Sequence, residues 1–192
     1  QAAEIAQEAG ALLRNYFDRG VATEYKGDVD IVTEADRASE TLITQRLTTA
    51  FPDHGIYGEE GVRQRVESEY RWYVDPLDGT TNFAHGFPAF CVSLGLEHRP
   101  PDRPSDSDGV LVAGVIYDPT RDDLFVAEKD RGAWLNGRRI HVSETKHLAE
   151  ALLATGFPSR KRHASPNIHF YQEFTLRSHG VRRAGSAALD LA

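Results

Sequence analysis

"RWYVDPLDGTTNF", residues 71–83, places two carboxylates directly after an apolar strand pattern, and the rest of the chain can be interpreted from it. Residues 71–74 are typical of a strand. We expect that strand to stop at Asp75, because Pro76 cannot donate a hydrogen bond to a sheet and its ring fixes φ. Gly79 and the two threonines after it suit the start of a helix, where backbone N–H groups lack intrahelical partners. Carboxylates at a strand end beside a helix start predict a place for metal ions and for a phosphate.

The aspartates at positions 75 and 78 can be explained in two ways. One is a capped turn, with Asp78 as the N-cap of the following helix. The other is a magnesium-type site, in which the turn directs the Asp75 carboxylate, the Leu77 carbonyl and the Asp78 carboxylate toward one point, since Mg²⁺ requires hard oxygen ligands. We favour the metal site, because Gly79 and Thr80 add a phosphate-sized nest of N–H groups.

The acidic segment "YGEEG", residues 57–61, is interpreted together with the strand that follows it. Alone it would be interpreted as a solvated loop. However, Glu59 closes a strand candidate just before the strand that carries Asp75, so adjacent strands would bring these two carboxylates together at one sheet end. Two successive glutamates point to opposite sides of an extended chain, so only one of the pair can readily join the aspartates.

A third acidic segment, "DIVTEAD", spans residues 30–36. On local grounds Thr33 and Asp36 are capping residues of the next helix. A functional interpretation makes Asp36 the base-like partner of Thr80, so that the two groups together orient a water molecule.

Composition excludes several classes of protein. The chain of 192 residues is long enough for one core or two small lobes, and 40% hydrophobic and 27% charged residues are ordinary for a globular protein. The net charge of −7 disfavours a general nucleic-acid binder. This negative charge would also repel an anionic phosphate ester. A phosphate site here therefore requires bound cations that make the local electrostatic potential positive.

The sequence contains no apolar run near the ~20 residues of a membrane span and no signal-peptide pattern, so we expect no membrane contact. The only cysteine, Cys91, lies in an apolar run, where a buried structural thiol is expected rather than a nucleophile. A single cysteine also fits a reducing cytoplasm.

The pattern of elements predicts an α+β fold, because runs of strands lie between pairs of helices. We expect helices at 2–18, 34–50 and 163–178, and a truncated one from Ser186. Strands are expected at 56–59, 70–75, 90–98, 110–117, 124–128 and 181–183, with a hairpin turn at 135–139, a long loop at 99–109, and a helical turn followed by a strand at 147–156. We divide the chain into an N-terminal α+β lobe, 1–146, which holds the metal-binding motifs, and the start of a C-terminal α/β lobe, 147–192. Since the sequence lacks Met and ends inside a helix-like pattern, we expect both ends to be cut and the second lobe to be incomplete.

Four segments together resemble the inositol monophosphatase family of magnesium-dependent, lithium-sensitive phosphatases: "DIVTEAD", "GEE", "WYVDPLDGTTNFAHGFP" and "RRAGSAALDLA". The resemblance covers essentially the whole chain, and the "DPLDGTTNF" block is highly specific. It implies a layered αβαβα sugar-phosphatase fold, truncated here at its C-terminal part, and a homodimer.

The resemblance also implies roles for the matched residues. The family's metal ligands, for two or three Mg²⁺ ions, correspond to Glu59, Asp75, the Leu77 carbonyl and Asp78. The groups that would position and activate the nucleophilic water are Thr80, Asp36 and Glu59. The phosphate would be held by the amides of Gly79 and Thr80, and the substrate hydroxyls by Gly185, Ser186 and Ala187. The family's last metal-binding aspartate lies in a Trp-Asp motif, and neither Trp72 nor Trp134 precedes an aspartate here.

The function implied by the resemblance is hydrolysis of a small phosphate monoester by metal-activated water, with inositol-1-phosphate or a related sugar or polyol phosphate as substrate. Histidinol phosphate, fructose bisphosphate and nucleotide bisphosphates remain alternatives within the same family. A haloacid-dehalogenase-type phosphatase is disfavoured, because its aspartates lie two residues apart rather than three. A catalytically idle interaction protein that keeps the fold is the alternative of another class. The basic cluster "SRKRH", residues 159–163, could contact an anionic partner together with Arg182 and Arg183, although it is more often a solvated loop.

Overall fold

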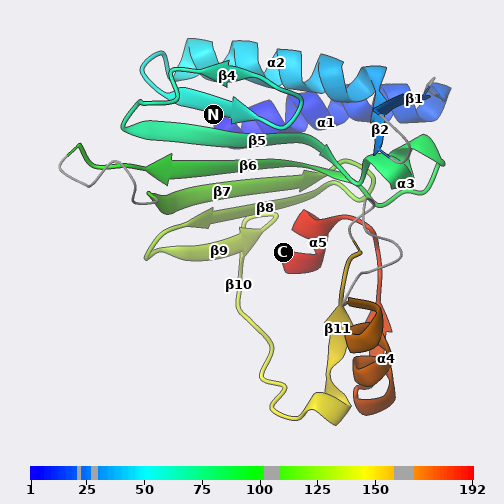
Figure 1. Ribbon diagram of the computed structural model, residues 1–192. Coiled ribbons are helices and arrows are strands. Elements are labelled where there is room, and N and C mark those ends of the chain that lie inside the picture. Colours follow the sequence, from blue (N-terminus) through cyan, green and yellow to red (C-terminus); the bar gives the residue numbers. More distant parts are fainter. Residues whose placement is uncertain (21–22, 27–29, 102–108, 158–166) are drawn as a thin grey trace.

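An eight-stranded sheet forms the centre of the protein in a computed structural model that describes residues 1–20, 23–26, 30–101, 109–157 and 167–192 (Figure 1). Its strand order is β10-β9-β8-β7-β6-β5-β3-β4. The strands are β3 (Gly55–Gly58), β4 (Arg63–Gln64), β5 (Tyr70–Asp78), β6 (Cys91–His98), β7 (Val110–Asp118), β8 (Asp123–Glu128), β9 (Gly132–Leu135) and β10 (Arg138–Ile140). Neighbouring strands are antiparallel except β3 and β5, which run parallel. The predicted α+β class is therefore confirmed.

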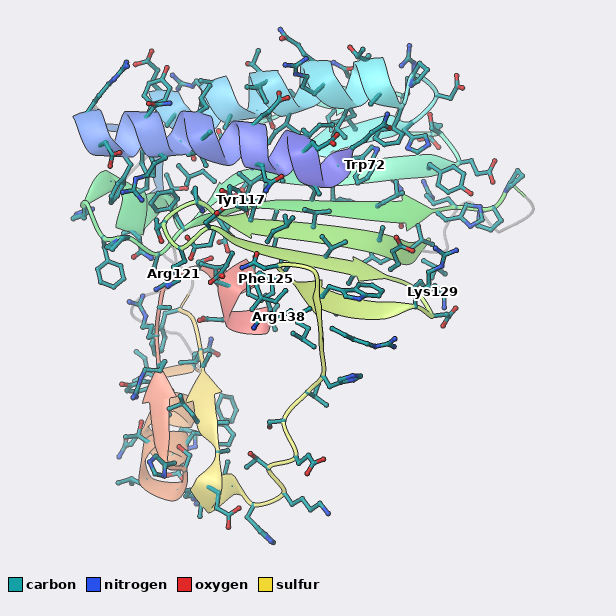
Figure 2. All side chains as sticks on the ribbon, turned by 180° about the vertical axis from the view of Figure 1, so that it is seen from behind. Trp72, Tyr117, Arg121, Phe125, Lys129 and Arg138 are labelled. Atoms are coloured by element: carbon teal, nitrogen blue, oxygen red, sulfur yellow. The ribbon has the colours of Figure 1, made fainter. Side chains whose placement is uncertain are left out.

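Helices α1 (Ala2–Arg19) and α2 (Glu34–Ala50) cover one face of this sheet (Figures 1 and 2). Both were predicted from their apolar spacing, and their buried stripes join the strand residues in one core. Several side chains of this core are completely or almost completely buried, among them Leu13, Ile43, Leu47, Trp72, Val74 and Phe90. Burial of each such aliphatic or aromatic side chain contributes roughly 1.5–3 kcal/mol, so this layer stabilises the packing of α1 and α2 on the sheet.

Strand β5 corrects the prediction that the chain turns at Asp75. It continues to Asp78, with a bulge between the pairs Asp75–Ser93 and Asp78–Cys91 of the β5–β6 ladder. Pro76 lies inside this bulge, where no ladder hydrogen bond is required of it. The strand continues because β6 offers pairing partners on both sides of the proline, which a local pattern does not show.

The shorter elements agree with the sequence in part. The hairpin turn between β9 and β10 is confirmed, with Asn136 and Gly137 both at positive φ. The loop at 99–109 joins the neighbouring strands β6 and β7 as expected, and its residues 102–108 lie outside the described residues. The β1–β2 hairpin (Thr23–Lys26 and Asp30–Thr33) and strand β4 were not predicted.

The elements between residues 148 and 182 lie apart from the large sheet (Figure 1). The short 3₁₀ turn Leu148–Glu150 precedes β11 (Leu152–Ala154), which pairs in parallel with β12 (Gly180–Arg182), and α4 (Asn167–Arg177) packs on β12. The helix predicted at 163–178 thus corresponds to α4, and residues 163–166 lie outside the described part. The last helix, α5 (Ala187–Leu191), returns to contact β6 and β7 of the large sheet. The division of the chain at residues 146 and 147 stays a prediction.

Among the described residues, no helix combines the length and the apolar character needed to cross a membrane.

Candidate metal and phosphate site

The parallel pairing of β3 and β5 brings two of the predicted carboxylates together. Gly58 pairs with Val74, and the next amide, that of Glu59, donates a hydrogen bond to the Val74 carbonyl at 3.0 Å. Glu59 and Asp75 therefore leave the two strands at the same level, as expected from the sequence. Their side chains are close enough to hydrogen-bond to each other.

The electrostatics of Asp75 are those of a crowded anionic site. Burial raises its pKa to about 9, with further contributions from the charge of Glu59, the hydrogen bond to Glu59 and the charge of Asp78. The carboxylate also accepts the Leu77 amide hydrogen at 3.1 Å through Oδ1, which favours the charged form. Three carboxyl groups this close repel one another as anions, and a cation between them would remove that repulsion.

Thr80 and Asp36 are in direct contact, although 44 positions separate them in the sequence. The Thr80 hydroxyl lies 3.1 Å from Asp36 Oδ1 and 3.0 Å from the Leu77 carbonyl oxygen. The other carboxylate oxygen, Oδ2, accepts the Thr33 amide hydrogen at 2.8 Å and the Thr33 hydroxyl at 2.6 Å. Asp36 thus keeps its predicted capping position at the start of α2 and also reaches the site, so the two interpretations of this residue are compatible.

Asp36 is almost fully buried, with 1% of its surface exposed. Burial raises its pKa, while the hydrogen bonds from Thr33 and Thr80 act in the opposite direction, and the charge of Glu60 raises it further. The hydrogen bonds to its two oxygens fix the direction of the carboxylate toward Thr80.

Asp78 connects β5 to the C-terminal motif. Its Oδ2 accepts the Ser186 hydroxyl at 2.6 Å and the Ala188 amide hydrogen at 2.7 Å, and the buried Cys91 thiol lies 3.9 Å away. Burial raises the pKa of Cys91, so the expectation of a structural thiol is confirmed. Within the described part of the chain, Oδ1 of Asp78 accepts no hydrogen bond and is the oxygen left to face a cation.

Gly79 makes the passage from β5 to the short helix α3 (Thr80–Ala84) possible. Its φ is 98°, a left-handed conformation that favours glycine, and a Cβ at this position would lie 2.8 Å from the Ala89 carbonyl oxygen. The turn at Gly79 therefore leads the chain from Asp78 into α3, and the phosphate-binding role of the Gly79 and Thr80 amides stays a prediction.

A cavity of about 500 Å³ lies beside Asp78. Gly185, Ser186 and Ala187 line it, so the structure brings all three predicted substrate-contact residues to the site. Asp190 lines it as well, and burial and the charge of Asp78 raise the pKa of Asp190. The basic cluster at 159–163 lies outside the described residues.

Arg183 also faces this cavity, and its guanidinium lies 5.0 Å from the centre of the Phe157 ring. The lining thus includes a guanidinium, which can donate hydrogen bonds to an anionic group, and a carboxylate, which can accept them from hydroxyl groups. Asp190 was not assigned a role from the sequence.

The donor set can be tested against a magnesium-type ion. In the parts of the chain that the structure describes, no three His, Cys, Asp or Glu side chains are arranged as a ready-made metal site. The chemistry of the group nevertheless fits a hard divalent cation: the donors are carboxylate and carbonyl oxygens, and the charges of Glu59 and Asp78 both raise the pKa of Asp75.

Three residues that support the site were missed by sequence reasoning. Ser39 and Glu40 of α2 contact the backbone on either side of the carboxylate cluster. Asn82 donates hydrogen bonds to the carbonyls of Ala89 at 2.7 Å and Ala184 at 2.8 Å, which ties α3 to the C-terminal motif. Asn82 stands within the "DPLDGTTNF" block, so its position was a usable signal, whereas Ser39 and Glu40 look like ordinary polar helix residues.

Comparison with known proteins agrees with this geometry. The family model described as "Inositol monophosphatase family" matches residues 1–192. The chain is 41% identical to "Nus factor SuhB" of Pseudomonas aeruginosa, over 100% of this chain and 70% of the relative, and 41% identical to "Inositol monophosphatase 2" of Solanum lycopersicum, over 99% and 71%.

Among solved structures, the crystal structure of the extragenic suppressor protein suhB from Bartonella henselae superposes with a TM-score of 0.86 at 38% identity. The match covers 98% of this chain and 70% of that one, so the chain has the fold of these proteins over about two thirds of their length. The chain therefore belongs to the inositol monophosphatase family of phosphatases.

Proposed function

We propose that the protein hydrolyses a small phosphate monoester, inositol-1-phosphate or a related sugar or polyol phosphate, in a Mg²⁺-dependent reaction. The observation that carries this proposal is the contact between Thr80 and Asp36 beside the cluster of Glu59, Asp75 and Asp78. It combines a hydroxyl polarised by a buried carboxylate with a set of hard oxygen donors. The family membership and the curated inositol monophosphatases among the relatives support the same reaction.

The ligands proposed for two or three Mg²⁺ ions are Glu59, Asp75, the Leu77 carbonyl and Asp78. Such ions, when bound, neutralise phosphate charge and make water a better nucleophile at neutral pH. The acidic chain by itself repels its substrate, so the carboxylates would have to hold cations before a phosphate could enter.

Thr80 and Asp36 are proposed to orient the attacking water. A hydrogen bond to a charged acceptor is stronger than one to a neutral carbonyl, so the Thr80 hydroxyl is expected to donate to Asp36 rather than to Leu77. Its oxygen lone pairs then face outward and can accept a hydrogen from water. Glu59, the exposed member of the cluster, is the proposed second acceptor for a proton of the same water.

The remaining site residues are proposed to bind the ester. The amides of Gly79 and Thr80 would hold the phosphate, next to the aspartates that hold the ions. Gly185, Ser186 and Ala187 line the adjacent cavity and would contact substrate hydroxyls. No side chain here need become phosphorylated, because water is the nucleophile.

Other substrates and another class of function have specific support. The cavity carries both Arg183 and Asp190, so histidinol phosphate, a fructose bisphosphate or a nucleotide bisphosphate stays an alternative. One relative at 41% identity bears the name "Nus factor SuhB", which keeps the catalytically idle interaction protein as the second candidate. We also propose a cytoplasmic homodimer that requires neither membrane nor nucleic acid for its activity; sedimentation at several protein concentrations tests the dimer.

Phosphate release from a panel of these esters, with and without Mg²⁺, tests the proposal. We expect turnover of inositol-1-phosphate or a related polyol phosphate, loss of turnover with a chelator, and inhibition by Li⁺. Rapid quench with labelled substrate should trap no phosphorylated protein. Folded protein that releases no phosphate from any ester at any Mg²⁺ concentration would instead favour the interaction protein.

A further inference from the structure

Helix α2 contacts the site at more places than the proposed reaction uses. Asp36, Ser39 and Glu40 have the i, i+3, i+4 spacing of one helix face, and their exposed fractions are 1%, 0% and 5%. Figure 1 shows the first turns of α2 beside β2 and α3, at the end of the sheet where β5 passes into α3. Asp36 reaches Thr80, but Ser39 and Glu40 reach two other segments.

Glu40 holds the backbone around Glu59. Its Oε1 accepts the Glu60 amide hydrogen at 3.0 Å, and the Val62 amide also hydrogen-bonds to the carboxylate. The carboxylate packs directly on Gly58, where a Cβ would collide with it. Glu59 lies between Gly58 and Glu60, which both contact the Glu40 carboxylate. This buried carboxylate therefore determines the path of the segment that carries Glu59.

Ser39 holds the backbone around Asp75. Its hydroxyl donates to the Pro76 carbonyl at 2.9 Å. Pro76 lies in the β5 bulge, between two proposed ligands, Asp75 and the Leu77 carbonyl. The interrupted ladder frees this segment from regular pairing, and the hydrogen bond from α2 restores a fixed position for it.

We propose that Ser39 and Glu40 are positioning residues of the metal site, which hold the segments carrying Glu59 and Asp75 at one separation and thereby set the affinity for a divalent cation. The inference rests on the proposed function. Glu59 and Asp75 repel each other when both are charged, so their backbones must be anchored if the oxygens are to stay at the spacing that an ion requires. Groups behind metal ligands commonly change affinity by 10–100-fold when they are removed.

The simpler explanation is that both side chains only satisfy buried backbone groups. In that case their loss would lower the stability of the fold without changing the metal affinity of the folded protein. The two explanations differ in the dissociation constant for a metal, which can be measured without any turnover.

The experiment compares Ser39→Ala and Glu40→Gln with wild type by titration with Mn²⁺, in which electron paramagnetic resonance reports the free ion. Glutamine keeps the shape of Glu40 but presents an amide N–H₂ in place of one acceptor oxygen. Thr44→Val is the matched control, because Thr44 lies one turn further along α2, is buried, and has a hydroxyl that finds no partner among the described residues. Near-UV circular dichroism establishes that each variant is folded, and Ser39→Ala, the milder change, keeps the test valid if Glu40→Gln does not fold.

We expect the Kd for Mn²⁺ to rise about 10-fold or more in Glu40→Gln and about 3- to 10-fold in Ser39→Ala, with no change in Thr44→Val. The Mg²⁺ concentration for half-maximal phosphate release should rise in parallel, while kcat at saturating Mg²⁺ stays near the wild-type value. Variants that bind Mn²⁺ as tightly as the wild type would overturn the roles of Ser39 and Glu40 alone. Wild-type protein that neither binds Mn²⁺ nor releases phosphate would overturn the proposed function itself.

Discussion

Burial raises the pKa of both Asp36 and Asp75, but the groups around the two carboxyls differ. Three hydrogen bonds, two from Thr33 and one from Thr80, stabilise the charged form of Asp36 against burial. At Asp36 these hydrogen bonds hold the carboxyl group in a fixed orientation beside the Thr80 hydroxyl. Burial and, after it, the neighbouring carboxyl groups of Glu59 and Asp78 raise the pKa of Asp75 to about 9. A divalent cation bound beside Asp75 would offset the repulsion among these carboxyl groups.

Thr80→Ala tests the hydroxyl at this site. It should lower kcat about 100-fold or more with little change in KM, because a positioned proton acceptor contributes 10²–10⁴-fold to the rate. Steady-state phosphate release measures both constants. Thr80→Ser keeps the hydroxyl and serves as the matched control, so it should retain most of the activity. Equal activity of the serine and alanine variants would contradict the role.

His54 gives the fold a pH dependence away from the site. Its Nδ1 lies 3.1 Å from the indole Nε1 of Trp72, which can only donate, so the imidazole accepts there in its neutral form. The imidazole stacks on the rings of Phe51 and Tyr70, with centroid distances of 5.1 Å and 5.0 Å. Burial lowers the pKa of His54, and the charge of Asp53 partly offsets this effect.

The pKa of His54 in the folded protein lies below its unfolded value near 6.5. Above pH 6.5 the side chain is neutral in both states, so its titration does not change the free energy of unfolding. As the pH falls below about 6.5, the unfolded chain takes up the proton first. The free energy of unfolding should then drop, by at most about 1.4 kcal/mol per pH unit for one proton, until the pH passes below the folded pKa. Urea unfolding between pH 8 and 5 measures this slope, and subtraction of the His54→Gln variant isolates it from other groups. Identical slopes in the two proteins would exclude His54 as the cause.

At the scale of elements, the junction of β5 and α3 determines where the site residues lie. The bulge lets β5 continue to Asp78, and Gly79 then turns the chain into α3 with a positive φ. Packing against the Ala89 carbonyl and Phe90 leaves no room for a side chain at position 79. A regular strand or a larger residue here would displace Thr80 from Asp36.

Gly79→Ala should therefore lower the free energy of unfolding by roughly 2–5 kcal/mol, the sum of about 1–2 kcal/mol for a left-handed alanine and about 1–3 kcal/mol for overpacking. Gly86 is the matched control, since its φ is 71° but no atom lies within 4 Å of an added Cβ. Gly86→Ala should show only the first, smaller loss. Urea unfolding compares the two, and equal losses would mean that packing at Ala89 is unimportant.

At the scale of the whole molecule, the site joins segments from across the chain. The N-terminal sheet supplies Glu59, Asp75 and Asp78, α2 supplies Asp36, and the C-terminal motif closes on Asp78 through Ser186. The helices cover one face of the sheet, and α5 contacts its other face. A cation bound at the carboxylates would therefore connect parts of the protein that are distant in sequence, and binding should be visible as global stabilisation.

Thermal unfolding with increasing Mg²⁺ measures that stabilisation. Metal at 100 times its Kd should add about 2.7 kcal/mol and raise Tm. Asp75→Asn removes one charge from the crowded cluster, so the metal-free variant should be at least as stable as wild type but should lose most of the response to Mg²⁺. Glu67→Gln, at an exposed position between β4 and β5, makes the same change in net charge and should respond like wild type. A full Mg²⁺ response in Asp75→Asn would contradict the assignment of this ligand.

Much of the local structure could be predicted from local patterns. Helices α1 and α2, the hairpin at Asn136 and Gly137, and the meeting of Glu59 with Asp75 followed from apolar spacing, turn chemistry and the succession of strands. The end of β5 was predicted wrongly, because a proline pattern cannot show that β6 resumes pairing beyond it. Ser39, Glu40 and Asn82 were missed, because each acts on backbone groups between 7 and 102 positions away.

By itself, the sequence determined which chemical groups are available and which short spacings they have: the aspartates at 75 and 78, the glycine and threonine after them, and the capping pair at 33 and 36. These features depend on bonds and dihedral angles within a few residues, so they can be inferred from neighbours along the chain. The pairing of Asp36 with Thr80 was one of two hypotheses from the sequence, and the tertiary structure shows the contact. Only the tertiary structure decided that α2 anchors both ligand segments and that Asp75 is desolvated beside two other carboxyl groups. Contacts and desolvation of this kind arise when distant segments pack together, because burial and Coulomb interactions depend on distance in space rather than on separation along the chain.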